Sequence, residues 1–239
     1  MDLMSKKSVK DGSLYYRQKD ILRPLGGVFM IAAVILIYFG WTMISYYIAC
    51  VIAPLGLVFF FVGGSRHISD NDMLELSNRA MEGYDSVVTD APYFNRVVLK
   101  QPADVICEAY AFGETARHFK RSKNGAVVSD VLTRSHVFFT KDGLLVASRT
   151  LSLTNLHPET GDGMTNGYWE LPYATICSAS IEEHATSAAL TNTGKATTVR
   201  WYELVICDES GECLRLPVKN DMDASTLCDE INRRIPKMK

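Results

Sequence analysis

The apolar residues of this chain are concentrated in one stretch, residues 24–65, which contains no Asp, Glu, Lys, Arg or His. A bilayer core of about 30 Å needs roughly 20 helical residues at about 1.5 Å each. The uncharged stretch is about twice that length, so it predicts two membrane-spanning helices, over 21–39 and 43–62. Gly40 permits the reversal between them. Three amphipathic aromatic residues near the reversal favour the membrane interface, namely Trp41, Tyr46 and Tyr47.

The charges that flank this stretch predict its orientation. Basic residues concentrate on the cytoplasmic side of membrane proteins. Here they precede the first helix and follow the second, whereas the turn has no charge: Lys6, Lys7, Lys10, Arg17, Lys19, Arg23, Arg66 and His67. We therefore expect a protein of the cell membrane with both termini in the cytoplasm. The stretch is too long for a secretory signal peptide, and no comparably apolar helices are predicted that could bury it in a soluble fold.

Beyond the apolar stretch the pattern changes, first to a helix start in "SDNDMLELSNRAMEGY" and then to short alternating segments. Strands are predicted at 105–112, 135–140, 144–150, 168–172, 175–183, 197–208 and 213–218. The tight turn Lys141-Asp142-Gly143 predicts a hairpin. The chain closes with an amphipathic helix that carries Leu227, Ile231 and Ile235 on one face. This order predicts the α+β class, with a small antiparallel barrel or sandwich of about seven strands capped by a helix.

The patterns divide the chain into four regions. A basic cytoplasmic segment covers 1–20 and a two-span transmembrane hairpin covers 21–64. A helical linker follows over 65–99, and the β domain with its C-terminal helix covers 100–239. Small residues in the first span, Gly26, Gly27, Ala32 and Ala33, could permit close helix packing, which leaves a homo-oligomer possible.

Three segments of the β domain carry a family resemblance: "SHVFFTKDGLLVAS", "WELPYATICSASIEE" and "WYELVICDESGECLRLPV". Together with the final helix they resemble bacterial pleckstrin-homology-like (PH-like) domains, a set that is similar to GRAM modules. The matching positions are Thr140, Leu144, Leu171, Pro172, Tyr173 and Ile176. The resemblance implies a PH-like fold with a two-helix membrane anchor. It also implies a non-enzymatic role, in which the domain binds a protein partner at the bilayer surface as a scaffold or sensor.

A basic cluster after the first domain strand suggests an alternative function. It contains Arg117, His118, Lys120, Arg121 and Lys123. Eukaryotic relatives of the fold bind lipid phosphates with basic residues in this loop, and cations near a bilayer gain from anionic headgroups. The alternatives are therefore a lipid-headgroup-binding module and an ordinary solvated loop. The net charge of -2 and the pI near 6.2 give no reason to expect nucleic-acid binding.

Catalytic signatures are missing from the sequence. Ser135 and His136 are neighbours in a predicted strand, so their side chains point to opposite faces and cannot act together. The motifs G-x-S-x-G, G-x-x-x-x-G-K-[ST] and H-E-x-x-H do not occur. We therefore predict no catalytic, cofactor-binding or metal-binding residues and no cofactor. A small membrane-bound hydrolase, or an accessory subunit of one, is the alternative from another class.

The cysteines give information on the redox environment. There are six: Cys50, Cys107, Cys177, Cys207, Cys213 and Cys228. They form no C-x-x-C pair, which argues against a structural zinc site. We interpret them as free thiols in a reducing compartment. Cys207 and Cys213, however, flank "DESGE" and could face each other across a hairpin.

Overall fold

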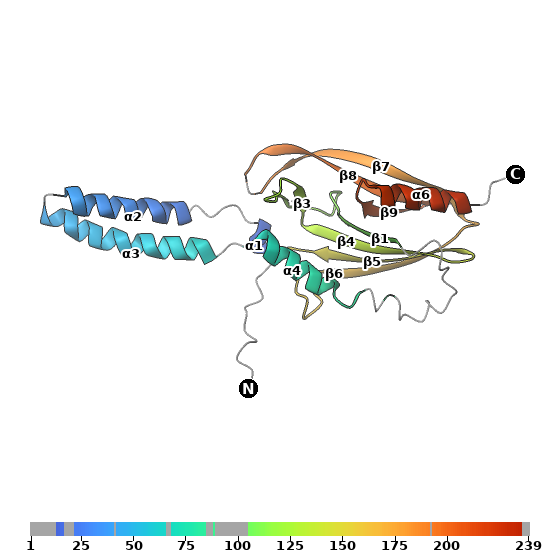
Figure 1. Cartoon of the computed structure of the whole chain (residues 1–239), viewed down its shortest axis with the longest axis horizontal. Helices are drawn as coiled ribbons and strands as arrows, with labels where there is room; N and C mark the ends of the chain where they lie inside the picture. Colours follow the sequence, from blue (N-terminus) through green and yellow to red (C-terminus); the bar gives the residue numbers. More distant parts are fainter. Residues whose placement is uncertain are drawn as a thin grey trace, which may run out of the picture. The chain divides into compact units, whose positions relative to one another are not determined.

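The computed structural model of the chain describes residues 13–16, 22–40, 42–65, 68–84, 88, 105–191 and 193–235. These residues form two compact units (Figure 1). One unit is Arg17–Ser69, and the other joins Met1–Tyr16 to Asp70–Lys239. Trp41, the basic residues before Ser13, Arg17, Lys19, Arg66, His67 and much of the predicted 65–99 linker lie outside the described residues.

The first unit is a pair of apolar helices, α2 (Leu22–Phe39) and α3 (Met43–Ser65). Both are long and apolar enough to cross a membrane, which confirms the two predicted helices. The Gly40 N–H donates to the Leu36 carbonyl at 3.0 Å at the reversal. A Cβ at Gly40 would lie 2.1 Å from that same oxygen, so the close approach requires glycine. Tyr46 and Tyr47 lie in the first turns of α3 with exposed side chains.

Close packing of α2 on α3 depends on small residues. A Cβ at Gly26 would lie 2.6 Å from both the Gly56 carbonyl oxygen and the Phe60 nitrogen. Gly27, its neighbour in sequence, has nothing within 4 Å of the corresponding position. The two helices therefore approach each other at Gly26 and Gly56, whereas Gly27 faces away from this contact. The predicted role of small residues in close packing applies here within one chain.

The second unit is built on antiparallel sheets. One sheet has the order β1-β4-β5-β6 and contains β1 (Val105–Tyr110), β4 (Val131–Phe139), β5 (Gly143–Ser152) and β6 (Met164–Pro172). Another has the order β7-β8-β9 and contains β7 (Ile176–Ala189), β8 (Ala196–Asp208) and β9 (Cys213–Val218). A short pair, β2 (Phe119–Arg121) and β3 (Val127–Ser129), occupies the predicted basic loop. The seven longer strands overlap the predicted ones, and the α+β class is confirmed.

The main core lies where these sheets meet α6 (Met222–Arg234). Its members include Phe139 and Val146 from the first sheet, Leu204 from the second, and Leu227 and Ile231 from α6. Asp221 caps this helix, because its Oδ1 accepts from the Ala224 N–H at 3.0 Å. The predicted amphipathic helix is thus confirmed, with its apolar face in the core.

A second apolar cluster covers the opposite face of the first sheet. Phe138, Leu145 and Ala147 pack there with Tyr84 and Val88, which follow α4 (Asp70–Met81). The Arg149 side chain donates to the Ala80 carbonyl at 2.9 Å and so joins β5 to the end of α4. Both faces of β4 and β5 are therefore buried, which explains why "VFF" and "LLVA" are continuous apolar runs rather than alternating ones.

Cys207 and Cys213 form a disulfide in this structure. The interpretation of all six cysteines as free thiols is therefore wrong for this pair, while Cys50, Cys107, Cys177 and Cys228 are free. The turn after Cys207 brings the two residues directly opposite each other in the β8–β9 register, with their Cα atoms 4.1 Å apart. The register of the hairpin, rather than a cysteine motif, is what pairs them.

Candidate functional site

The β domain holds the two chain segments that adjoin the apolar hairpin in sequence. The short helix α1 (Ser13–Tyr16) precedes the hairpin, and α4 begins at Asp70 just after it. The Asp70 carboxylate accepts from the Tyr15 hydroxyl at 3.0 Å and from the Lys123 N–H at 2.8 Å. The Lys120 ammonium lies 3.6 Å from it. We call these four residues, Tyr15, Asp70, Lys120 and Lys123, the Asp70 clamp.

The charged and polar groups of the Asp70 clamp interact favourably and shift one another's pKa values. The Lys120 ammonium lies 3.5 Å from the centre of the Tyr15 ring, a cation–π contact. Burial, together with the hydrogen bond to Asp70, raises the pKa of Tyr15 well above its ordinary value. Partial burial acts to raise the pKa of Asp70, but the Lys123 and Tyr15 hydrogen bonds and the Lys120 charge outweigh it and lower that pKa. The clamp therefore contains an ionised carboxylate at neutral pH.

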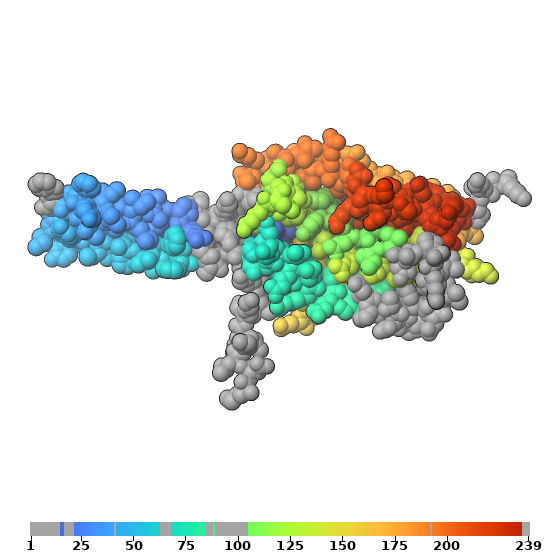
Figure 2. Space-filling model, in the orientation of Figure 1, coloured from blue at the N-terminus to red at the C-terminus, as the bar shows by residue number. Residues whose placement is uncertain are grey.

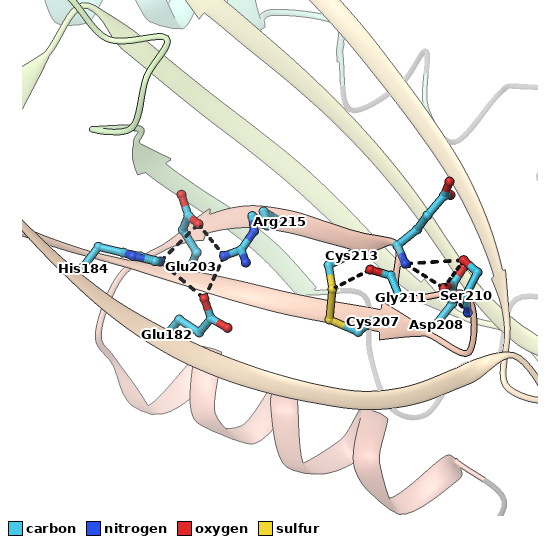
Figure 3. The surroundings of a disulfide bond; sticks show 10 residues. Glu182, His184, Glu203, Cys207, Asp208, Ser210, Gly211, Cys213 and Arg215 are labelled. Carbon is cyan, nitrogen blue, oxygen red and sulfur yellow. Dashed lines mark hydrogen bonds and ion pairs between the residues drawn. A yellow bond between two sulfur atoms is a disulfide. The ribbon is translucent and has the colours of Figure 1, made fainter.

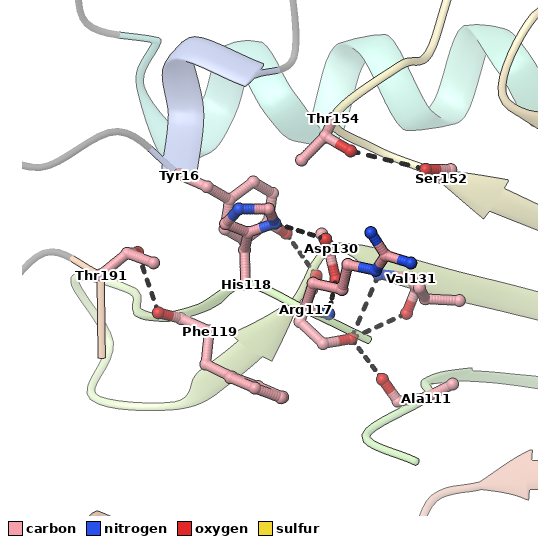
Figure 4. A network of polar contacts seen from close by, with 11 residues as sticks. Tyr16, Ala111, Arg117, His118, Phe119, Asp130, Val131, Ser152, Thr154 and Thr191 are labelled. Carbon is pink, nitrogen blue, oxygen red and sulfur yellow. Dashed lines mark hydrogen bonds and ion pairs between the residues drawn. The ribbon is translucent and has the colours of Figure 1, made fainter. Parts of the chain in front are cut away.

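A second carboxylate, Asp130, lies in the same region of the domain (Figure 4). It is buried between β3 and β4. Its oxygens accept from the Arg117 N–H at 3.0 Å and contact His118 Nδ1 at 2.8 Å. The Tyr16 hydroxyl donates to the Ser129 carbonyl beside it. Tyr15 and Tyr16 are thus both anchored on the β2–β3 segment, and Asp130 orients the imidazole of His118.

These contacts place each residue of the predicted basic cluster. Lys120 and Lys123 meet Asp70, while Arg117 and His118 meet Asp130. Arg121 donates to the Gly125 carbonyl at 3.3 Å and to Thr197 Oγ1 at 3.4 Å. The Lys120 ammonium contacts the Asp70 carboxylate and the Tyr15 ring within the domain. Lipid binding by the cluster stays a prediction, for which Arg117 and Lys123 have exposed side chains.

The outer face of the β7–β9 sheet carries a second polar group (Figure 3). Arg215 Nη1 lies 2.7 Å from Glu182 and 3.4 Å from Glu203. His184 Nε2 lies 3.3 Å from Glu203, and its ring stacks on Trp201 with centroids 5.2 Å apart. The Cys207–Cys213 disulfide occupies the same face. Each carboxylate thus has a cationic neighbour, an arrangement typical of a stabilised surface ladder.

Ser135 and His136, the adjacent pair considered as nucleophile and base, lie on opposite faces of β4. His136 stacks on Phe138 and meets the Tyr84 ring edge-on, on the α4 side of the first sheet. Ser135 is its neighbour in β4 and alternates to the other face, opposite Cys107 in register. The structure therefore separates this pair, as predicted. Within the described residues, no group of three or more His, Cys, Asp or Glu side chains is arranged to hold a metal ion.

Two of the four clamp residues, Tyr15 and Asp70, have no signature in the sequence. Tyr15 and Asp70 are 55 positions apart, and the only local role that the sequence suggests for Asp70 is that of a helix cap. The pairing of an acidic side chain with a basic one across two distant segments can be recognised only when the positions of both segments are known. The basic cluster was a usable signal for one half of the clamp, because it marks where an acidic partner would be needed.

We expect Asp70→Asn to lower the free energy of unfolding of the β domain by about 1–3 kcal/mol at neutral pH, because it weakens several charge-assisted bonds at once. The folded-state pKa of Asp70 is lowered. Its contribution is therefore full above the unfolded-state pKa, about 3.9, and is lost as the pH falls below that value through the folded-state pKa. Denaturant titrations of the parent and of Asp70→Asn between pH 7 and pH 2.5 test this, because the difference between their free energies of unfolding should shrink as the pH falls.

Lys123→Ala is the matched control for this prediction. Lys123 contributes its backbone N–H to the clamp, and alanine keeps that donor. We expect a change within about 0.5 kcal/mol. An Asp70→Asn effect no larger than this, or one that is the same at every pH, contradicts the assigned role of the carboxylate.

Comparison of the chain with protein-family models, with curated proteins and with solved structures found no match, so the PH-like resemblance stays a prediction.

Proposed function

We propose that this chain is a membrane-anchored adaptor. The hairpin α2–α3 is its two-span anchor, and the β domain, a PH-like module, lies in the cytoplasm. There it binds a protein partner at the bilayer surface as a scaffold or sensor. The basic residues on both sides of the apolar stretch support this orientation. The Cys207–Cys213 disulfide opposes it, because disulfides are rare in a reducing cytoplasm.

The surface of the helical unit supports the anchor. Large apolar side chains are exposed along both helices, among them Val28, Ile31, Val34, Val51, Val58 and Phe61. Apolar exposure of this extent is typical of a surface that contacts lipid or another protein. Its length matches a bilayer core, since each helix contains about 20 residues.

The Asp70 clamp is the observation that carries the proposal. The chain runs from Tyr16 into the hairpin through residues 17–21 and returns to Asp70 through residues 66–69. The clamp joins α1 and the start of α4 to the β2–β3 segment, so the domain is attached at both ends of the anchor. Both chain segments that lead to the proposed anchor are therefore held within the domain itself.

In-membrane crosslinking tests the proposal. A photo-crosslinking residue at exposed Lys123 or Arg117 of the full-length chain, in the membranes where it is made, should capture the same protein repeatedly. The same group at Tyr38, near the hairpin reversal, serves as control and should capture no cytoplasmic protein. Capture of lipid alone at the domain positions would contradict the adaptor and favour the headgroup-binding alternative.

A reporter fused after Lys239 tests the orientation separately. We expect a reporter that is active only outside the cytoplasm to stay inactive. Activity of that fusion would contradict the proposed topology.

A further inference from the structure

Three cysteines lie on the three neighbouring strands of the β7–β9 sheet. Cys207 of β8 is bonded to Cys213, which stands directly opposite it on β9 (Figure 3). Cys177 is a free, exposed thiol of β7. Because the strand order is β7-β8-β9, Cys207 lies between the strand of Cys177 and the strand of Cys213. We call these three residues the cysteine row.

A bulge in β7 brings Cys177 to the face that carries the disulfide. Ile176 pairs with Asp208 in the β7–β8 register. The next pair is Ser178 with Cys207, which leaves Cys177 as an extra residue of β7. In such a bulge two residues of one strand oppose one residue of its partner. Ile176 packs in the main core, whereas Cys177 and Ser178 are both exposed, so both face Cys207 from the outer side of the sheet.

The inner face of this part of β7 is closed by the core. Ala179, which follows the bulge, packs there in one cluster with Leu227 of α6. Figure 2 shows α6 (red) against this part of the sheet (orange). The cysteine row lies on the opposite face, where Cys213 is exposed and Cys207 is partly exposed. The row is therefore accessible to solvent and to small reagents.

We infer that the cysteine row is a site of intramolecular thiol–disulfide exchange, in which Cys207 alternates between Cys213 and Cys177 as its partner. The Cys177 thiolate attacks Cys207 Sγ and a bond forms between these two sulfur atoms. The Cys207–Cys213 bond breaks, and its electron pair stays on Cys213 Sγ. Cys177 has given up a proton and Cys213 takes one up. The protein keeps the same oxidation level, so the step needs no external oxidant or reductant.

The geometry of the sheet suits this exchange. Opposite residues of neighbouring antiparallel strands have Cα atoms about 4.5–5.5 Å apart, within the range of about 4.4–6.8 Å found for bonded cysteines. The attacking sulfur must approach from the side opposite the leaving sulfur. β7 and β9 flank β8 on opposite sides, so Cys177 approaches Cys207 from the side away from Cys213.

The exchange changes which strands are linked and which residue carries the free thiol. When Cys213 is the partner, the disulfide closes the β8–β9 turn and the thiol lies on β7. When Cys177 is the partner, the disulfide joins β8 to the bulge of β7 and the thiol lies on β9. The inference does not depend on the proposed adaptor function or on the orientation in the membrane, because the step takes place within the β domain alone.

A Cys213→Ser variant of the full-length chain in mild detergent tests whether Cys177 reaches Cys207. Cys50→Ser is included in each protein, because that thiol is exposed on the hairpin. The matched control also carries Cys177→Ser and Ser180→Cys, which moves the thiol about 7–10 Å along the exposed outer face of β7. We expect mild oxidation to form the Cys177–Cys207 disulfide at least about tenfold faster than the disulfide from position 180. Peptide mass spectrometry after alkylation measures both rates.

Alkylation of the oxidised protein with Cys213 intact tests the exchange itself. The protein is incubated without reductant at about pH 8, where thiols are partly ionised. It is then acidified to stop the exchange, alkylated with N-ethylmaleimide and digested. We expect alkylated Cys213 in molecules that carry the Cys177–Cys207 link. Cys177→Ser should lower the alkylation of Cys213 at least about tenfold, because serine cannot attack the disulfide.

Either test can overturn the inference. A Cys177–Cys207 disulfide that forms no faster than the one from position 180 would show that Cys177 does not reach Cys207. Alkylation of Cys213 that is the same with and without Cys177 would show that no exchange takes place. The second result is independent of the first, because it uses the protein with its disulfide intact.

Discussion

Replacing Leu227 by alanine is expected to lower the free energy of unfolding of the β domain by about 2–5 kcal/mol. Leu227 is 1 % exposed and lies in the main core with Ile231 and Leu204. Truncation removes buried apolar surface and leaves a cavity that two sheets and a helix cannot easily close. Denaturant titration of the full-length protein in detergent, followed by tryptophan fluorescence, measures the loss, because Trp169 packs against this core.

Met222→Ala is the control within the same helix. Met222 is 82 % exposed at the start of α6, so its truncation removes little buried surface and should change the free energy by less than about 0.5 kcal/mol. If both variants lose the same stability, α6 does not dock through Leu227, and the assignment of this helix to the core is wrong.

Replacing Gly26 by valine is expected to destabilise the packing of α2 on α3. The new Cβ would meet the Gly56 carbonyl and the Phe60 nitrogen, which are backbone atoms that no side-chain rotation can move. The helices must separate locally, at a cost of about 1–3 kcal/mol. The helical content of the full-length protein, followed as sodium dodecyl sulfate is added to a mild detergent, should fall at a lower denaturant fraction than in the parent.

Gly27→Val tests whether the position or the residue type causes this effect. The site at Gly27 is open, so valine there changes the local helix propensity without a clash. We expect the Gly27 variant to behave like the parent within about 0.5 kcal/mol. A larger effect at Gly27 than at Gly26 would mean that the helices pack through a different face.

Several elements could be predicted from the sequence because their causes are local. The uncharged stretch 24–65 has the length of two bilayer spans, and Gly40 marks the point where the chain turns. Asp142-Gly143 marks the hairpin between β4 and β5. Leu227 and Ile231 lie four residues apart on one face of α6, so the period of the pattern indicates both the helix and its buried side.

Strand number was harder to predict, and the reason is physical. β2 and β3 are three residues each, too short for alternation to show. They are held by contacts with distant segments, including the hydrogen bond from Thr191 N–H to the Phe119 carbonyl at 2.7 Å. A basic cluster within such a short pair has the composition of a loop.

The sequence by itself determined the apolar hairpin, the longer strands and the closing helix, because periodicity, charge and length act over neighbouring residues. Only the tertiary structure decided which partners meet. It joined Asp70 to Tyr15, placed Cys213 opposite Cys207, and set Asn232 against Ala179 at the edge of β7. Such contacts join residues that lie far apart in the chain or depend on hairpin register, and neither is specified by a local pattern.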